Sequence, residues 1–149
     1  MQLLLVGISH RTAPVELRER VDFQARGVAD ALRSLAERGS TREAAVVSTC
    51  NRAEIVVACD DAAATHDDLT RFFGDFNHVP PTDVAPHLYQ LVDLDAARHL
   101  FRVAAGLDSL VVGEPQILGQ VKDAHAVASE TKTVGPVLNR LFHSSFAVG

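Results

Sequence analysis

Apolar positions in the first ninety residues form short runs that predict strands and wider-spaced stripes that predict helices. The expected strands are residues 3–9, 43–49, 53–59 and, more weakly, 87–92. The expected helices are residues 15–21, 24–38 and 66–76. A very short polar break, Cys50-Asn51-Arg52, separates the two middle strands and predicts a β-hairpin. The order strand, helix, strand, strand, helix, strand is typical of a ferredoxin-like split β-α-β arrangement, an antiparallel sheet with helices on one face.

Three further helices are expected after this sheet. Their apolar stripes are Leu94, Ala97, Phe101 and Ala104, then Ile117, Val121, Ala124 and Ala128, then Leu138, Leu141, Phe142 and Ser145. Pro136 suits the first turn of the last helix. The fold class is therefore α+β, one domain over residues 1–149, with the sheet in 1–92 and a helical extension in 93–149. An apolar helix that reaches the last residue predicts a longer parent protein.

Composition favours a folded protein outside the membrane. The 149 residues are 47% hydrophobic and 22% charged, a balance typical of globular domains. The net charge of −5 argues against a general nucleic-acid binder, so contact with a polyanion would need a local cluster. Candidates for that cluster are Arg11, Arg18, Arg20 and Arg52. The sequence has no secretory signal and no apolar run near the roughly 20 residues of a membrane span, so we expect a cytoplasmic protein.

Cys50 is the first candidate for chemistry. At a hairpin turn its thiol would be accessible, and backbone N–H groups there could bind an oxyanion. Arg52 is two residues away, and a nearby cation favours the nucleophilic thiolate. Thr49 and Asn51 add hydrogen-bonding groups. The alternative is an incidental loop thiol, which for a lone cysteine is the more common case.

Cys59 is expected to be a small packing residue near a strand end. Nine residues of extended chain place it roughly 30 Å from Cys50, whereas a disulfide needs Cα atoms within about 7 Å. No His pair stands at zinc-ligand spacing with these cysteines, so we expect no metal. The glycines form neither a Gly-x-Gly-x-x-Gly motif nor a phosphate loop, so no nucleotide site is expected in this chain.

His99 is the most informative histidine. On a helix whose core stripe contains Leu94, Ala97, Phe101 and Ala104, its side chain would point about 160° from the middle of that stripe. His99 is therefore expected to be either a solvated side chain or a group that faces a cleft as an acid, a base or a positioning residue.

Residues 106–116 form an unusual polar segment before the helix that contains Ile117. Gln116 and Gln120 are one helical turn apart and fall on one face. Together with Ser109 and Glu114 they could bind the amine and carboxylate of a small polar ligand. The alternative is a turn and a helix start with no ligand.

Several of these segments resemble glutamyl-tRNA reductase, in order and with the spacing of that family. They are residues 7–14 (GISHRTAP), 48–52 (STCNR), 99–101 (HLF), 106–122 and 136–142 (PVLNRLF). The strings TCNR and GEPQILGQ are highly specific, and the resemblance covers essentially the whole chain.

The resemblance implies a role for each position. Cys50 would attack the ester carbonyl of glutamyl-tRNA and release the tRNA, and NADPH would reduce the thioester to glutamate semialdehyde, the first step of tetrapyrrole and haem synthesis. His99 matches a histidine linked to activity. The residues that match the family's glutamate-recognition positions are Thr49, Cys50, Asn51, Arg52, Ser109, Glu114, Pro115, Gln116 and Gln120.

The resemblance also implies parts that this chain lacks. The NADPH-binding domain and the long dimerisation helix of the family are absent, so the fragment is not expected to complete the reduction. The whole protein is expected to be a homodimer in contact with glutamate semialdehyde aminomutase. Val56 stands where an aromatic residue is expected, which concerns local packing. Two other classes stay open, a thiol esterase or acyltransferase and a non-catalytic ligand-binding module.

Overall fold

The computed structural model describes residues 1–24, 27–107 and 116–148. Within them, four antiparallel strands form one sheet in the order β2-β3-β1-β4. The strands are β1 (Gln2–Ser9), β2 (Glu43–Ser48), β3 (Arg52–Cys59) and β4 (Tyr89–Val92). The helices are α1 (Val15–Arg20), α2 (Val28–Glu37), α3 (Ala62–Asn77), α4 (Pro81–Val84), α5 (Leu94–Ala104), α6 (Gln116–Glu130) and α7 (Pro136–Val148), with a 3-10 turn at Ala85–His87.

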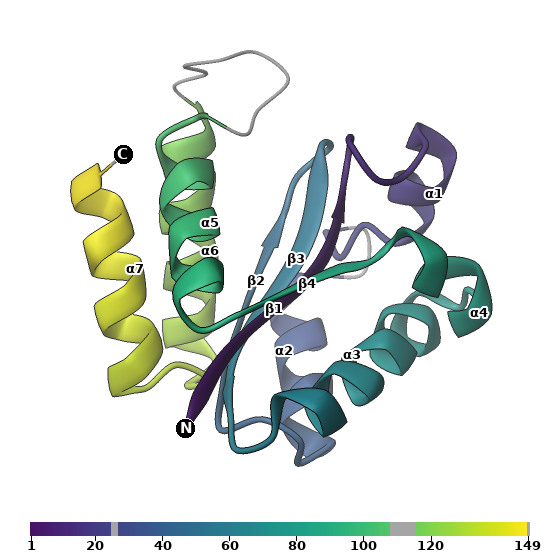
Figure 1. Ribbon diagram of the computed structural model, residues 1–149, viewed down its shortest axis with the longest axis horizontal. Helices are drawn as coiled ribbons and strands as arrows, with labels where there is room; N and C mark the ends of the chain where they lie inside the picture. The colour runs from purple at the N-terminus through teal and green to yellow at the C-terminus, as the bar shows by residue number, and fades with distance from the viewer. Residues whose placement is uncertain (25–26, 108–115, 149) are drawn as a thin grey trace.

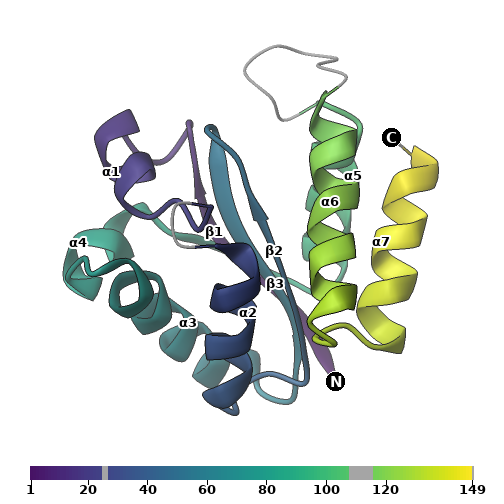
Figure 2. The same ribbon diagram turned by 180° about the vertical axis from the view of Figure 1, so that it is seen from behind.

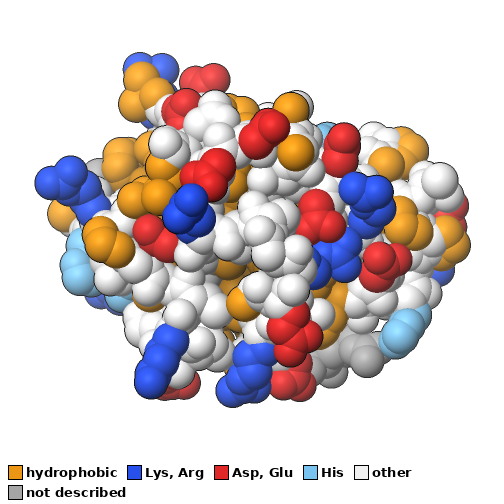
Figure 3. Space-filling view, turned by 90° about the horizontal axis from the view of Figure 1, so that it is seen from below, with side chains coloured by type: hydrophobic (Ala, Val, Ile, Leu, Met, Phe, Trp, Pro, Cys, Tyr) orange, Lys and Arg blue, Asp and Glu red, His pale blue; other side chains and the backbone are white. Residues whose placement is uncertain are grey.

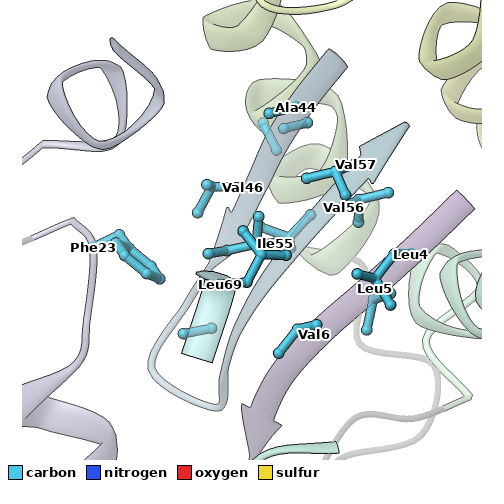
Figure 4. Close-up of a cluster of buried hydrophobic side chains, with 14 of the residues drawn as sticks. Leu4, Leu5, Val6, Phe23, Ala44, Val46, Ile55, Val56, Val57 and Leu69 are labelled. Atoms are coloured by element: carbon cyan, nitrogen blue, oxygen red, sulfur yellow. The ribbon is translucent and has the colours of Figure 1, made fainter. Parts of the chain in front are cut away.

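Helices cover both faces of the sheet, with α2 and α3 on one side and α5, α6 and α7 on the other (Figures 1 and 2). The first core layer lies under α2 and α3, where Ile55 and Val46 of the sheet are buried near Phe23 and Leu69 (Figure 4). Stacked and tilted rings of Phe23, Phe72, Phe73 and Phe76 extend this layer. Burial of such side chains contributes about 1.5–3 kcal/mol each, so this layer fixes the sheet that carries the hairpin.

The second layer joins the last three helices to the sheet. All four residues of the α6 stripe and all four of the α7 stripe predicted above are buried. Glu43, at the start of β2, is 7% exposed and accepts hydrogen bonds from the N–H groups of Gly135 (2.7 Å), Val137 (3.2 Å) and Leu138 (2.8 Å). A carboxylate at this position satisfies N–H groups that the first turn of α7 cannot pair internally. Glu43 therefore fixes the start of α7 on the edge strand of the sheet.

The structure confirms an antiparallel four-stranded sheet with helices and differs from the predicted elements in several places. The helix predicted at 24–38 is shorter and spans Val28–Glu37. Helices were predicted on one face of the sheet, but only α2 and α3 share a face. Helices α5, α6 and α7 cover the other face, because their apolar stripes also need a sheet to pack against. The helix predicted at 66–76 begins earlier, at Ala62, because the Asp61 side chain caps the N–H groups of Ala63 and Ala64. Helix α4, which begins at Pro81, was not among the predicted elements.

We expect Glu43→Ala to destabilise the fold more than an ordinary surface substitution, because it leaves buried N–H groups at the start of α7 without an acceptor. The loss of a charged, buried acceptor predicts a cost of about 2–4 kcal/mol in the free energy of unfolding. Glu37→Ala, at an exposed position of α2, is the matched control and should cost less than about 0.5 kcal/mol. Urea unfolding measures both variants, and equal costs would contradict the role of Glu43.

Candidate functional site

The tip of the β2–β3 hairpin consists of two residues, Cys50 and Asn51. The Thr49 N–H donates to the Arg52 carbonyl (2.8 Å) and closes the hairpin. Arg52, which the sequence placed in the break, is therefore paired with Thr49 instead. The Asn51 N–H donates to Thr49 Oγ1 (3.1 Å), and the His10 N–H donates to the Asn51 carbonyl (2.9 Å). The end of β1 therefore holds the tip in place. Cys50 projects outward and is exposed.

Arg18 of α1 supports the tip from a second side. Its Nη1 donates to the Ala13 carbonyl (2.7 Å) and its Nε to the Cys50 carbonyl (3.4 Å). Within the described part of the chain, no carboxylate pairs with Arg18. At the opposite end of the molecule acidic and basic side chains are interspersed (Figure 3), and Arg42 there pairs with Asp60 (2.8 Å). The cation beside Cys50 is thus the Arg18 guanidinium.

Arg52 does not lie where the sequence analysis expected it. It is 2% exposed, and its Nη1 lies 3.4 Å from Glu54 Oε2, two residues further along β3. A buried guanidinium needs an anionic partner, and Glu54 supplies one. Arg52 is therefore a buried ion-pair residue. Its expected place in a surface cluster with Arg11, Arg18 and Arg20 is wrong.

Glu54 is the centre of a buried polar network. The side chain is fully buried, and its Oε2 also accepts the Tyr89 hydroxyl (2.5 Å) and a hydrogen bond with His99 Nε2. Among the described residues its Oε1 has no hydrogen-bond partner. β3, β4 and α5 thus each direct one side chain at a single carboxylate oxygen.

Gly7 makes room for this network. Gly7 of β1 stands between Glu54 of β3 and Tyr89 of β4 in the sheet register. A Cβ atom at position 7 would approach Glu54 Cγ to 2.6 Å and the Ala53 carbonyl to 2.7 Å. The missing side chain lets Glu54 and Tyr89 meet across the central strand.

The environment fixes the protonation of both acidic groups. Burial alone would raise the pKa of Glu54. The hydrogen bond with His99, the charge of Arg52 and the Tyr89 hydroxyl outweigh it, so that the pKa of Glu54 lies below its usual value. Burial and the Glu54 carboxylate raise the pKa of Tyr89 far above its usual value. Glu54 is therefore an anion and Tyr89 a neutral donor at physiological pH.

His99 is neither a simple solvated residue nor directed away from the packed face. Its side chain is only 17% exposed and bonds to Glu54. The helix is rotated from the predicted orientation, because Ala96, Leu100 and Val103 are buried, whereas Leu94 is 61% exposed. Ala97 and Phe101, which belong to the predicted stripe, are only partly buried and pack at the edge of the core. Among the described residues no hydrogen bond joins His99 to Cys50, and Arg52 and Glu54 lie between them along the sheet.

Gln120 lies close to the strand that leads into the hairpin. It lines a cavity of about 110 Å³ with Gln24, Ser48 and Asp123 between α2 and α6. Gln24 Nε2 donates to the Ser48 carbonyl (2.6 Å) at the mouth of this cavity. The start of α6 and the tip of the hairpin are at the same end of the molecule (Figures 1 and 2). Gln116 begins α6, and the predicted site residues Ser109, Glu114 and Pro115 lie outside the described residues.

Cys59 is a packing residue, as predicted. It is fully buried, and this burial raises the pKa of its thiol. A thiol that stays protonated is a poor nucleophile. Cys59 therefore serves as an internal control for Cys50.

The sequence analysis missed Glu54 and Tyr89. The signal for Glu54 was available, since it is the one charged residue between Ala53 and Cys59 in a strand otherwise made of apolar residues. A charge in a strand buried on both faces must be paired. Tyr89 gave no comparable signal, because aromatic residues are ordinary in strands.

The described residues hold no group of three or more His, Cys, Asp or Glu side chains arranged for a metal ion. They also include no helix with the length and apolar character that crossing a membrane requires.

The family model, the relatives and the solved structure described here that match this chain are all glutamyl-tRNA reductases. The sequence model described as "Glutamyl-tRNAGlu reductase, N-terminal domain" matches residues 6–149. The glutamyl-tRNA reductases of Aromatoleum aromaticum and Geobacter sulfurreducens are 49% and 47% identical over 148 residues, which is 99% of this chain and 34% of each relative. The structure of glutamyl-tRNA reductase from Methanopyrus kandleri superimposes with a TM-score of 0.81 at 30% identity, covering 97% of this chain and 32% of that one. The chain thus spans about a third of these relatives.

The contact with Glu54 gives His99 a role in stability. His99→Asn should lower the free energy of unfolding by about 1–3 kcal/mol, because it weakens the hydrogen bonding of a buried, ionised carboxylate. The exposed neighbour Arg98, replaced by Ala, should change it by less than about 0.5 kcal/mol. Thermal unfolding of both variants measures the difference. A His99→Asn variant as stable as the parent would mean that the contact with Glu54 does not stabilise the fold.

Proposed function

Because the chain belongs to the glutamyl-tRNA reductase family and corresponds to its N-terminal domain, we propose that it captures the glutamyl group of glutamyl-tRNA as a thioester on Cys50. The observation that carries this proposal is the exposed thiol of Cys50 on a two-residue turn that His10 and Arg18 hold from two sides. A nucleophile on a fixed turn can meet a large substrate without rearrangement of the fold.

The proposed step exchanges one acyl bond for another. The Cys50 thiolate attacks the ester carbonyl carbon, a C–S bond forms, and the C–O bond to the tRNA ribose breaks. The ribose oxygen keeps the electron pair and takes a proton, and we assign its donation to His99. The turn already uses the N–H groups of Thr49 and Asn51, so the Cys50 N–H is our candidate donor to the carbonyl oxygen in the transition state.

The glutamyl group would bind around the hairpin. We propose that Thr49, Asn51, Arg52 and Gln120 contribute to its recognition, together with Ser109, Glu114, Pro115 and Gln116, as the family resemblance implies. Ser48 shares the cavity of Gln120 and directly precedes Thr49, which supports this placement. Arg18 gives the adjoining surface a positive charge at the point where a tRNA acceptor end would arrive.

We place the reduction itself outside this chain. A thioester needs a hydride to become an aldehyde, and NADPH would supply it. All pairs of neighbouring strands in the described sheet are antiparallel, whereas dinucleotides bind at the carboxyl ends of parallel strands. The sequence also lacks the glycine motif of such sites. These residues therefore do not fit the cofactor, and a further domain of the longer protein would bind it.

The remaining proposals follow from the same family. The product would be glutamate semialdehyde for tetrapyrrole synthesis, in the cytoplasm, by a homodimer that contacts glutamate semialdehyde aminomutase. For residues 1–92 we propose the ferredoxin-like class. The order β1, α2, β2, β3, α3, β4 and the strand order β2-β3-β1-β4 support this assignment.

We expect Cys50→Ser to abolish acyl capture without loss of stability, because Cys50 is exposed and contributes little packing. Incubation with glutamyl-tRNA that carries a labelled glutamyl group, followed by denaturation, measures the protein-bound label. Cys59→Ser is the matched control and should retain capture. Label on the Cys50→Ser variant at the parental rate would contradict the proposal.

Two comparisons in the same assay separate the other classes. A thiol esterase of broad range would accept other aminoacyl-tRNAs as readily as glutamyl-tRNA. A binding module without catalysis would show no covalent label, and glutamyl-tRNA would leave the alkylation rate of Cys50 unchanged.

The fragment alone should show no saturable binding of NADPH and form no semialdehyde. It should at most hydrolyse glutamyl-tRNA slowly, because water takes the place of hydride. Fluorescence titration with NADPH and product analysis test this, and saturable binding by the 149-residue chain would contradict it. Joining the chain to the rest of a full-length relative should restore the reduction.

A further inference from the structure

The network around Glu54 has a geometry that goes beyond filling the core. Three donors from three elements converge on the same oxygen, Glu54 Oε2, although the other oxygen of the carboxylate has no partner among the described residues. Together the three donors compensate for the burial of an ionised carboxylate. The same bonds fix the orientation of the third group, the imidazole of His99.

The bond to Glu54 determines which nitrogen of His99 can act. Nε2 lies against the carboxylate, so in the neutral ring the proton resides on Nε2. Nδ1 has no hydrogen-bond partner among the described residues. Because part of the side chain is exposed, Nδ1 is the nitrogen that remains for proton exchange.

We propose that Glu54 and Tyr89 are positioning residues that hold His99 in one orientation and one tautomer, with Nδ1 as the atom that exchanges a proton with the substrate. This inference rests on the proposed function, because it concerns the proton that the ribose oxygen takes. Tyr89 acts through Glu54: its hydroxyl bonds to the carboxylate, and its ring lies 5.7 Å from the imidazole ring. Neither residue needs to touch the substrate.

The proton balance of the step is closed. Protonated His99 gives the Nδ1 proton to the ribose oxygen as the C–O bond breaks, and the neutral ring stays bound to Glu54 through Nε2–H. Glu54 lies two residues beyond Arg52, the first residue of β3 after the two-residue tip. The step requires an acyl group over Arg52, with its carbonyl carbon within reach of the Cys50 thiolate and its ribose oxygen within hydrogen-bond reach of His99 Nδ1.

The charged groups around His99 are few. Glu54 faces it from β3 with Arg52 behind, and Tyr89 faces it from β4. On its own helix Asp95 and Arg102 lie one turn away on either side and are exposed. Within the described residues no hydrogen bond or ion pair joins His99 to α6 or α7. Glu54 is thus the charged group in contact with the ring, and its removal should be visible in which ring nitrogen carries the proton.

The first test reads the tautomer of the neutral His99 ring by nitrogen-15 NMR in the 149-residue chain. The parent ring should carry its proton on Nε2, against Glu54. Glu54→Gln replaces a pure acceptor by an amide that can also donate, so the two tautomers should mix. Tyr89→Phe leaves the acceptor in place and should keep Nε2–H. A parent ring with its proton on Nδ1, or a tautomer unchanged in Glu54→Gln, would overturn the proposal, whether or not the chain captures an acyl group.

The second test varies the leaving group. Glutamyl-tRNA releases an alcohol that needs a proton, whereas the thiophenyl ester of glutamate releases a stable thiolate. Both Glu54→Gln and Tyr89→Phe should slow capture from glutamyl-tRNA, the former at least tenfold, and leave capture from the thiophenyl ester within about twofold of the parent. Glu37→Gln, on the exposed face of α2, is the charge-matched control.

Each outcome has one meaning. Equal slowing with both esters would make Glu54 and Tyr89 merely structural, and no slowing with either would leave them without a role in proton transfer. Both results overturn the inference. Failure of the parent chain to react with either ester would instead refute the proposed role of Cys50, and the NMR measurement of the tautomer would still decide on Glu54. If Glu54→Gln does not fold, Tyr89→Phe and the two esters provide the test alone.

Discussion

A carboxylate with no access to water constrains the whole centre of this domain. Glu54 can stay ionised inside an apolar sheet only if donors surround it, and they come from β3, β4 and α5. The central strand must then lack a side chain at Gly7, and α5 must turn His99 toward the sheet although Leu94 becomes exposed. The rotation of α5, the identity of residue 7 and the burial of Arg52 are three consequences of one requirement.

The same strand connects this buried network with an exposed thiol. Thr49 and Arg52, which flank the two-residue tip, are buried, whereas Cys50 on the tip itself is exposed. Although the tip is exposed, it is held in place. The backbone N–H of His10 and the side chain of Arg18 each donate a hydrogen bond to it. In the proposed step, Cys50 and His99 act on the same acyl group. The hairpin tip holds Cys50, and the network around Glu54 holds His99.

Local patterns were sufficient for most of the elements and for the exposed position of Cys50, and insufficient for the network. The hairpin, the buried faces of α6 and α7 and the inert role of Cys59 depend on residues near in sequence, so periodicity and spacing predicted them. The orientation of α5 depends on Glu54, 45 residues earlier in the chain. The predicted apolar stripe included Leu94 and left out Leu100 and Val103, so the predicted orientation of the helix was wrong. Arg52 was expected on the surface for the same reason, because its partner was not recognised. Long-range pairing of buried charges was the missing information.

The central claim is that Cys50 carries the glutamyl group. Its most direct test is to incubate the 149-residue chain with glutamyl-tRNA, quench it in acid, digest it and locate the adduct by mass spectrometry. We expect one glutamyl group, labile to hydroxylamine as thioesters are, on the peptide that contains Cys50. An adduct on Cys59 or another residue, or no adduct when the tRNA is deacylated by the chain, would contradict the account.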